Sequence, residues 1–66
     1  MNNDSVRISE KIALTISEAA LLSNIGQNKI DALLRLPDCP FLLKIGAKRL
    51  VKRKEFEHFI STHTEL

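Results

Sequence analysis

The strongest chemical signal in the sequence is a run of six basic residues that no acidic residue interrupts. The chain carries 10 Lys and Arg against 8 Asp and Glu, a formal net charge of +2, so most of its positive charge falls in this one segment. Such asymmetry is typical of a protein that binds nucleic acid or another anionic surface, although a basic run can also be a solvated face without a partner. The residues are Lys44, Lys48, Arg49, Lys52, Arg53 and Lys54.

A second set of side chains suited to nucleic acid lies on a predicted helix over residues 27–36. At 100° per residue, Ile30, Leu33 and Leu34 share the core side of this helix, and the opposite side is polar and partly basic. Amide side chains can pair with adenine edges, and Lys or Arg can reach guanine or phosphate. Asp31 departs from this pattern, since DNA phosphates repel a carboxylate; it either accepts from a cytosine amino group or faces away. The candidate recognition residues are Gln27, Asn28, Lys29, Ala32 and Arg35.

No catalytic or cofactor-binding pattern accompanies these residues. The sequence has no nucleophile motif that combines Ser, His and an acid, and Gly26 and Gly46 are too isolated to form a phosphate-binding loop. Cys39, His58 and His63 lack the close paired spacing of a structural zinc site. The sequence therefore predicts a protein that is not an enzyme and that holds no metal or cofactor.

Length and cysteine content narrow the protein class further. A chain of 66 residues predicts one compact unit with a modest core, and a single cysteine excludes a disulfide scaffold of the secreted type. The N-terminal residues lack the basic start and apolar run of a signal peptide, and no apolar stretch has the length of a membrane span. We expect a cytoplasmic protein without a membrane partner.

Local signals predict two helices in the first half of the chain. Thr15 and Glu18 have the spacing of a capping box, so the first helix should begin at Ile16. A tight connection over residues 24–26 separates this helix from the one over residues 27–36, which the two following prolines must end. Two helices in this order, joined by a short turn, indicate a helix-turn-helix unit.

A β-hairpin and a third helix are predicted in the second half. Residues 41–45 and 49–52 favour strands, and Gly46-Ala47, with or without Lys48, supplies the turn between them. The third helix follows over residues 53–61 and closes the core. The aromatic residues assigned to the core are Phe41, Phe56 and Phe59.

These elements, with a short edge strand over residues 11–14, indicate an α+β fold of the small winged helix-turn-helix class. The domain is expected to span residues 11–61, between a flexible tail over residues 1–10 and a short tail over residues 62–66. A helix fits the major groove of DNA, while a hairpin can lie along the phosphates or reach the neighbouring minor groove. The candidate contacts of this hairpin, or wing, are Lys44, Gly46, Lys48 and Arg49, and the further candidate phosphate contacts are Lys52, Arg53 and Lys54.

Four segments of the chain carry a family resemblance: LTISEA (14–19), IGQNKI (25–30), GAKR (46–49) and KRKEFE (52–57). Together they resemble the small excisionases of conjugative transposons, which are related to the winged-helix family that includes the mercury-resistance-type regulators. The resemblance implies a sequence-specific, double-stranded DNA-binding architectural protein that directs a tyrosine-type integrase towards excision of a mobile element. The partners that it implies are duplex DNA, the integrase and further copies of the chain on adjacent sites.

Two other functions are compatible with the same residues. A small winged-helix transcriptional regulator would share the fold and the groove chemistry, and a neighbouring recombinase gene would favour the excisionase over it. A protein–protein adaptor would instead direct the basic face to an acidic partner. Failure to bind duplex DNA at low salt would favour the adaptor.

Overall fold

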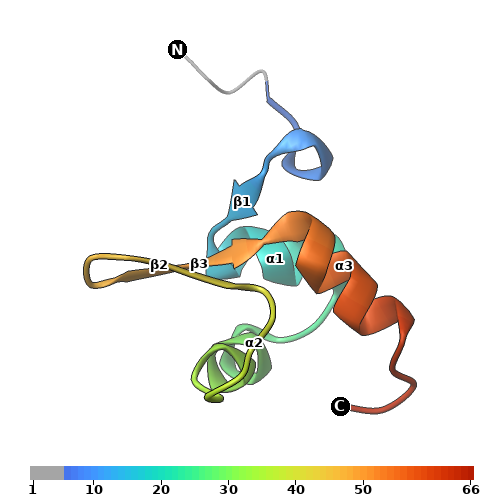
Figure 1. Cartoon of the computed structure of the whole chain (residues 1–66). Coiled ribbons are helices and arrows are strands. Elements are labelled where there is room, and N and C mark those ends of the chain that lie inside the picture. The colour runs from blue at the N-terminus through green and yellow to red at the C-terminus, as the bar shows by residue number, and fades with distance from the viewer. Residues whose placement is uncertain (1–5) are drawn as a thin grey trace.

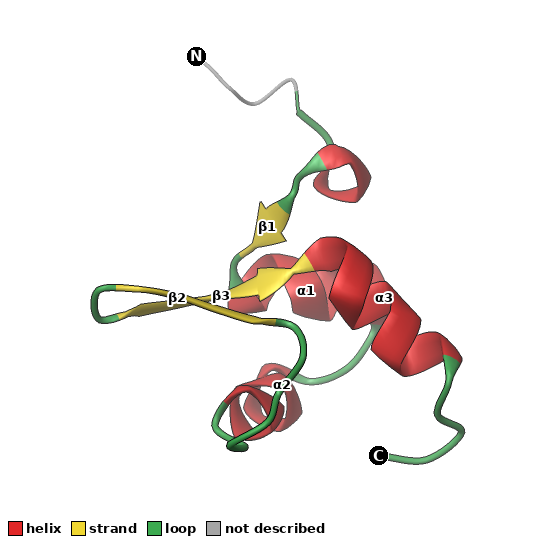
Figure 2. Ribbon diagram, viewed as in Figure 1, coloured by secondary structure: helices red, strands yellow, loops and turns green. Residues whose placement is uncertain are grey.

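The computed structural model describes residues 6–66, in which three α-helices pack around a small antiparallel sheet (Figures 1 and 2). This architecture confirms the α+β class that the sequence predicts. The elements in chain order are the 3₁₀ helix η2 (Ile8–Glu10), β1 (Ala13–Leu14), α1 (Ile16–Ser23), α2 (Gln27–Leu34), β2 (Leu42–Ile45), β3 (Lys48–Lys52) and α3 (Arg53–Ser61).

The N-terminal end differs from the sequence prediction of a flexible tail over residues 1–10. Residues 1–5 of that segment lie outside the described residues. Ile8–Glu10 form η2, and Ile8 packs against the core, so packed structure begins before Lys11. The adjoining strand is shorter than predicted, with only two residues. The sequence gives no periodic signal for η2, because Ile8 is an isolated apolar residue among polar neighbours.

The helix α1 begins at the predicted capping box. The hydroxyl oxygen of Thr15 accepts from the Glu18 N–H (3.1 Å), and the Glu18 carboxylate accepts from the Thr15 N–H (3.0 Å). The other carboxylate oxygen of Glu18 accepts from Lys11 Nζ (2.5 Å). The hydrogen bond from Lys11, followed by the one from the Thr15 backbone, lowers the pKa of Glu18 below its ordinary value. One carboxylate thus caps α1 and holds the segment that precedes β1.

A short turn with its own hydrogen bonds joins α1 to α2. Asn24 adopts the left-handed conformation (φ 63°) at the end of α1, and its N–H donates to the Ala20 carbonyl (2.8 Å). The Ser23 hydroxyl donates to the Ala19 carbonyl (2.7 Å) and accepts from the Ile25 N–H (3.2 Å). Ala19 is fully buried, and its small side chain permits the close approach of α2.

The helix α2 ends two residues earlier than predicted, at Leu34. The Arg35 N–H is shared between the carbonyls of Asp31 and Ala32, and the Leu36 N–H donates to the Leu33 carbonyl (3.2 Å). These short-range bonds tighten the last turn, because Pro37 disfavours helical geometry in the residue before it. The predicted core side is confirmed, since all three of its residues are buried: Ile30, Leu33 and Leu34.

The strand β3 lies at the centre of the sheet, antiparallel to β1 on one side and to β2 on the other. The β2–β3 turn is the two-residue option, Gly46-Ala47, with Gly46 at φ 59°. Val51 is opposite Leu14 on β1 and opposite Leu42 on β2. Because Val51 is fully buried, this point of the sheet anchors all three strands in the core.

The aromatic residues hold α3 against the rest of the core. Phe41 and Phe56 are both fully buried, with ring centroids 5.0 Å apart and ring planes at 61°. Phe59 makes a similar edge contact with Phe41 at 5.1 Å. The predicted core role of these residues is confirmed. Within residues 6–66, no helix combines the length and the apolar character that crossing a membrane requires.

We expect Glu18→Gln to lower the stability by about 0.5–1 kcal/mol at pH 7, because the amide keeps an oxygen for the Thr15 N–H but loses the charge that pairs with Lys11. A carboxyl whose pKa is lower in the folded state stabilises the fold above its unfolded pKa, and this contribution is lost as the pH falls through the folded value. The difference between the native chain and Glu18→Gln should therefore shrink in acid.

Thermal unfolding followed by circular dichroism between pH 7 and pH 3 measures this difference. Glu65→Gln is the matched control, since Glu65 is exposed beyond the last helix and its substitution changes the net charge equally. A Glu18→Gln deficit that stays constant down to pH 3 would contradict the assigned role.

Candidate nucleic-acid interface

The β2–β3 hairpin projects away from the helices (Figure 1). Its base and α2 meet in one core cluster, which contains Val51 of β3 and three residues of α2, Ile30, Leu33 and Leu34. The base of the hairpin is held by buried Val51 and half-buried Leu42, whereas residues 44–48 near the tip are exposed. The positive φ of Gly46 makes the tight turn possible, so this glycine shapes the tip rather than contributing a side chain. The two elements with candidate DNA contacts are therefore neighbours in space.

The strand register places Lys44 directly opposite Arg49. Residues two apart on a strand share one face of a sheet, so this basic pair lies on the same face as Leu42 and Val51. Val51 is buried, so the pair continues the core-facing side of the sheet beyond the edge of the core. Like charges directly opposite each other destabilise a sheet, and a bound anion would relieve that repulsion.

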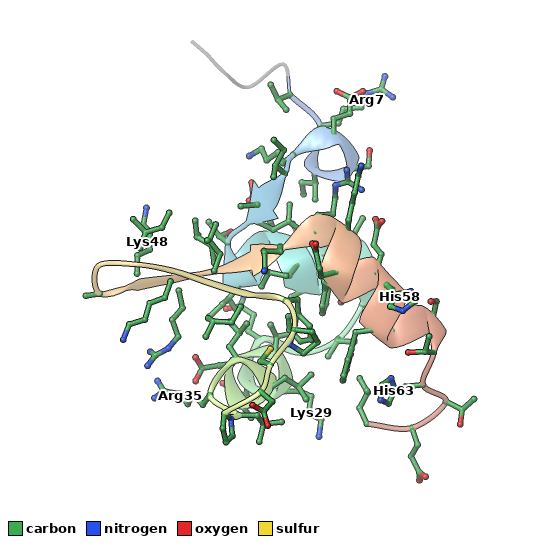
Figure 3. All side chains as sticks on the ribbon, in the orientation of Figure 1. Arg7, Lys29, Arg35, Lys48, His58 and His63 are labelled. Atoms are coloured by element: carbon green, nitrogen blue, oxygen red, sulfur yellow. The ribbon has the colours of Figure 1, made fainter. Side chains whose placement is uncertain are left out.

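Lys48 lies on the other face of the hairpin. It is opposite Ile45, and alternation places the Leu43–Leu50 pair and Lys52 on that same outer face. Figure 3 shows the Lys48 side chain pointing away from α2. The predicted wing residues are thus divided between two faces: Lys44 and Arg49 lie on the side of α2, and Lys48 lies on the opposite side.

The predicted recognition residues on α2 are all exposed, but they do not form one basic patch. Figure 3 shows Arg35 pointing to the side on which the hairpin projects, whereas Lys29 points to the other side of α2. No side chain caps the start of α2 at Gly26, so its first-turn amides are available to an anion. The predicted residues on α2 are Gln27, Asn28, Lys29, Ala32 and Arg35.

Asp31 is paired with Arg35 within α2. Its Oδ2 accepts a hydrogen bond from Arg35 Nε at 2.9 Å, and the two residues are four apart, the spacing at which helical side chains are neighbours. The carboxylate therefore does not face away from the candidate recognition side. It lies next to Arg35, the cation that points to that side.

The structure separates Arg53 from the other candidate phosphate contacts. Its Nε donates to the Lys11 carbonyl (2.6 Å), its Nη1 donates to Glu57 Oε1 (3.2 Å), and only 16% of its side chain is exposed. Arg53 thus connects the segment before β1 to α3, and phosphate binding is not supported as its main role. Lys52 is half-buried and Lys54 is exposed. Lys52 ends β3, and Arg53 and Lys54 begin α3, so all three are remote from the hairpin tip.

Sequence reasoning missed the structural role of Arg53, because its carbonyl partner is 42 positions away and no local pattern signals it. The pairings of Asp31 with Arg35 and of Lys44 with Arg49 had detectable signals, in the helical spacing and the hairpin register. In the part of the chain that the structure describes, no three His, Cys, Asp or Glu side chains come together to hold a metal ion.

Comparison with known proteins assigns no family: no family model, curated protein or solved structure matches the chain at a significant level. The candidate site is therefore defined by geometry. Arg35, at the C-cap of α2, points to the side on which the hairpin projects, and Asn28, two helical turns earlier, shares that side by helical spacing. We use the term hairpin–helix face for these two residues together with the basic pair, Lys44 and Arg49.

We expect Arg53→Ala to destabilise the fold by about 1.5–3 kcal/mol, because it removes a charged donor from the Lys11 carbonyl and an ion-pair partner from Glu57. The neighbouring Lys54→Ala is the matched control: it removes the same charge from an exposed position and should change the stability by less than about 0.5 kcal/mol. Denaturant unfolding measures both variants. Equal effects would mean that Arg53 is an ordinary surface residue.

Proposed function

We propose that the chain binds duplex DNA as a small winged-helix protein, with α2 as the recognition helix and the β2–β3 hairpin as the wing. The order of elements supports this proposal. A three-residue turn that ends in Gly26 joins α1 to α2, as in helix-turn-helix units, and the hairpin is the next element after the connection over residues 35–41. An α-helix fits the major groove of B-form DNA, and a hairpin beside it can follow the adjacent backbone.

The observation that carries the proposal is the cross-strand pair of Lys44 and Arg49 on the side of α2. In a chain of 66 residues with a small core, two like charges directly opposite each other reduce stability. Phosphates would neutralise both charges together. Arg35 extends the same positive side onto the helix, where the amide of Asn28 is suited to an adenine edge.

The resemblance to small excisionases extends the proposal to a role in recombination. On this extension the protein is an architectural factor on DNA near the ends of a mobile element, with a tyrosine-type integrase and neighbouring copies of itself as partners. Bending a short duplex costs roughly 1–6 kcal/mol, which contacts from several bound copies can offset. The protein needs no cofactor for this role, because it acts by holding DNA in a productive shape.

Duplex binding should depend steeply on salt. If about four or five phosphates are neutralised, the logarithm of the affinity should fall with the logarithm of the salt concentration with a slope of roughly −4. Replacing both Lys44 and Arg49 by Ala should reduce the magnitude of this slope by about 2. Fluorescence anisotropy with a labelled duplex, repeated over a range of salt concentrations, gives the slope.

Arg7→Ala is the control for that measurement, because Figure 3 shows Arg7 at the end of the molecule remote from α2 and the hairpin. It should leave the slope nearly unchanged. A salt-dependence slope near zero for the native chain would reject electrostatic DNA binding. No binding to duplex DNA at low salt would favour a protein–protein adaptor instead.

In the cell, deleting the gene should lower excision of the host element while integration and the level of integrase protein stay largely intact. The Lys44→Ala/Arg49→Ala double variant should reproduce the loss without unfolding the domain. Junction-specific PCR measures excision, and immunoblotting measures the integrase. Undiminished excision together with altered transcription from a bound promoter would assign the protein as a transcriptional regulator.

A further inference from the structure

Asp31 lies on the side of α2 that carries the hairpin–helix face. An acidic residue is unexpected at a surface that binds DNA, because phosphates repel a carboxylate. Asp31 follows Asn28 by three positions and precedes Arg35 by four, so helical spacing places all three side chains on one side of α2. Asp31 is partly buried and Arg35 is mostly exposed, with side chains 39% and 60% accessible. A pair that is this accessible to solvent contributes little to stability. Stabilisation of the fold therefore does not explain the acidic residue at this position.

The geometry of the pair leaves the outer part of the guanidinium group unoccupied. Asp31 Oδ2 accepts from Nε of Arg35 at 2.9 Å. Among residues 6–66, neither Nη atom of Arg35 makes a hydrogen bond to the protein. The two Nη atoms carry four further N–H donors in a planar fork, the arrangement that pairs with O6 and N7 of guanine.

The direction of the Arg35 side chain follows from its place in the helix. Arg35 is the C-cap of α2 and keeps helical backbone angles (φ −84°, ψ −7°). A side chain there leans back towards the start of the helix, over the residue one turn earlier, which is Asp31. The carboxylate then restricts a side chain that otherwise samples many rotamers. Restriction before binding lowers the entropic cost of forming a contact with two hydrogen bonds.

We propose that Asp31 is a positioning residue that holds the Arg35 guanidinium so that its Nη atoms read a guanine in the major groove. This inference rests on the proposed DNA-binding function. It assigns Asp31 a positive role in specificity, with some loss of affinity for every sequence as the consequence of its charge. Removing Asp31 should therefore weaken base discrimination while strengthening non-specific binding.

The test begins with the native chain, which selects a preferred duplex from a random pool. Affinities are then measured for every single base-pair change in that duplex. Arg35→Ala should remove the preference for guanine at one position, and Asp31→Ala should lower the preference at the same position by about 10-fold. The double variant should show no further loss there, because both changes remove the same contact. Asp31→Glu, which can still pair across four positions, should retain much of the preference.

Glu57→Ala is the matched control. It also breaks an Arg–carboxylate pair at this spacing, between Arg53 and Glu57 on α3, and it changes the net charge equally. Both Ala variants should bind random duplex slightly more tightly, but only Asp31→Ala should lose discrimination. Ala also favours helix, so α2 should stay folded, and circular dichroism checks this point.

Three results would overturn the inference. Asp31→Ala could behave like Glu57→Ala, or Arg35→Ala could leave all base preferences unchanged, and in both cases the native chain would still bind DNA. Failure of the native chain to bind any duplex would overturn the proposed function and this inference together. The binding of the native chain thus distinguishes the two failures.

Discussion

The alternation of side chains along β3 is the constraint on which the candidate interface depends. Val51 must face the core, where it is buried opposite Leu14 and Leu42. Arg49, two residues earlier, must then share that face, and Lys48 must take the other one. A shift of one residue in the register would exchange these faces and expose Val51. The hydrophobic core thereby sets which basic side chains lie on the side of α2.

Because the core is small, polar contacts between distant residues also stabilise the fold. Among residues 6–66, eight form the buried core, and no disulfide reinforces it, since the chain has one cysteine. Long-range polar contacts fill part of that role: Lys11 pairs with Glu18 through its side chain, and its carbonyl accepts from Arg53. These contacts join the segment before β1 to α1 and to α3. The basic residues therefore divide into two that maintain the fold, Lys11 and Arg53, and several that remain free for an anionic partner.

The tip of the hairpin has little support from the core. Beyond Leu42 and Val51, its strands are held by hydrogen bonds to each other and by a two-residue turn at Gly46. The Lys44–Arg49 pair lies in this projecting part, where no packing of apolar side chains into the core offsets the repulsion between the two charges. Such a segment can adjust to the contour of a partner more readily than α2, which buries three residues in the core.

The sequence by itself determined the features that depend on near neighbours. The capping box at Thr15, the hairpin turn at Gly46 and the bounds of α3 follow from local backbone chemistry, and the structure has all three as predicted. The core side of α2 follows from helical periodicity in the same way. Sequence patterns of this range identify elements and the face that each one buries, because the energies involved act within a few residues.

Only the tertiary structure decided how the basic run is distributed. In the sequence, residues 44–54 form one basic segment that no acidic residue interrupts. In the folded chain, Lys44 and Arg49 face the side of α2, and Lys48 faces the opposite side. Arg53 is held by the Lys11 carbonyl, 42 positions away, and by Glu57 on α3. Strand register and contacts between distant residues set these positions, and both arise only when the elements pack together. The packing of the sheet against the helices, rather than the order of charges, therefore selects the residues that form the candidate interface.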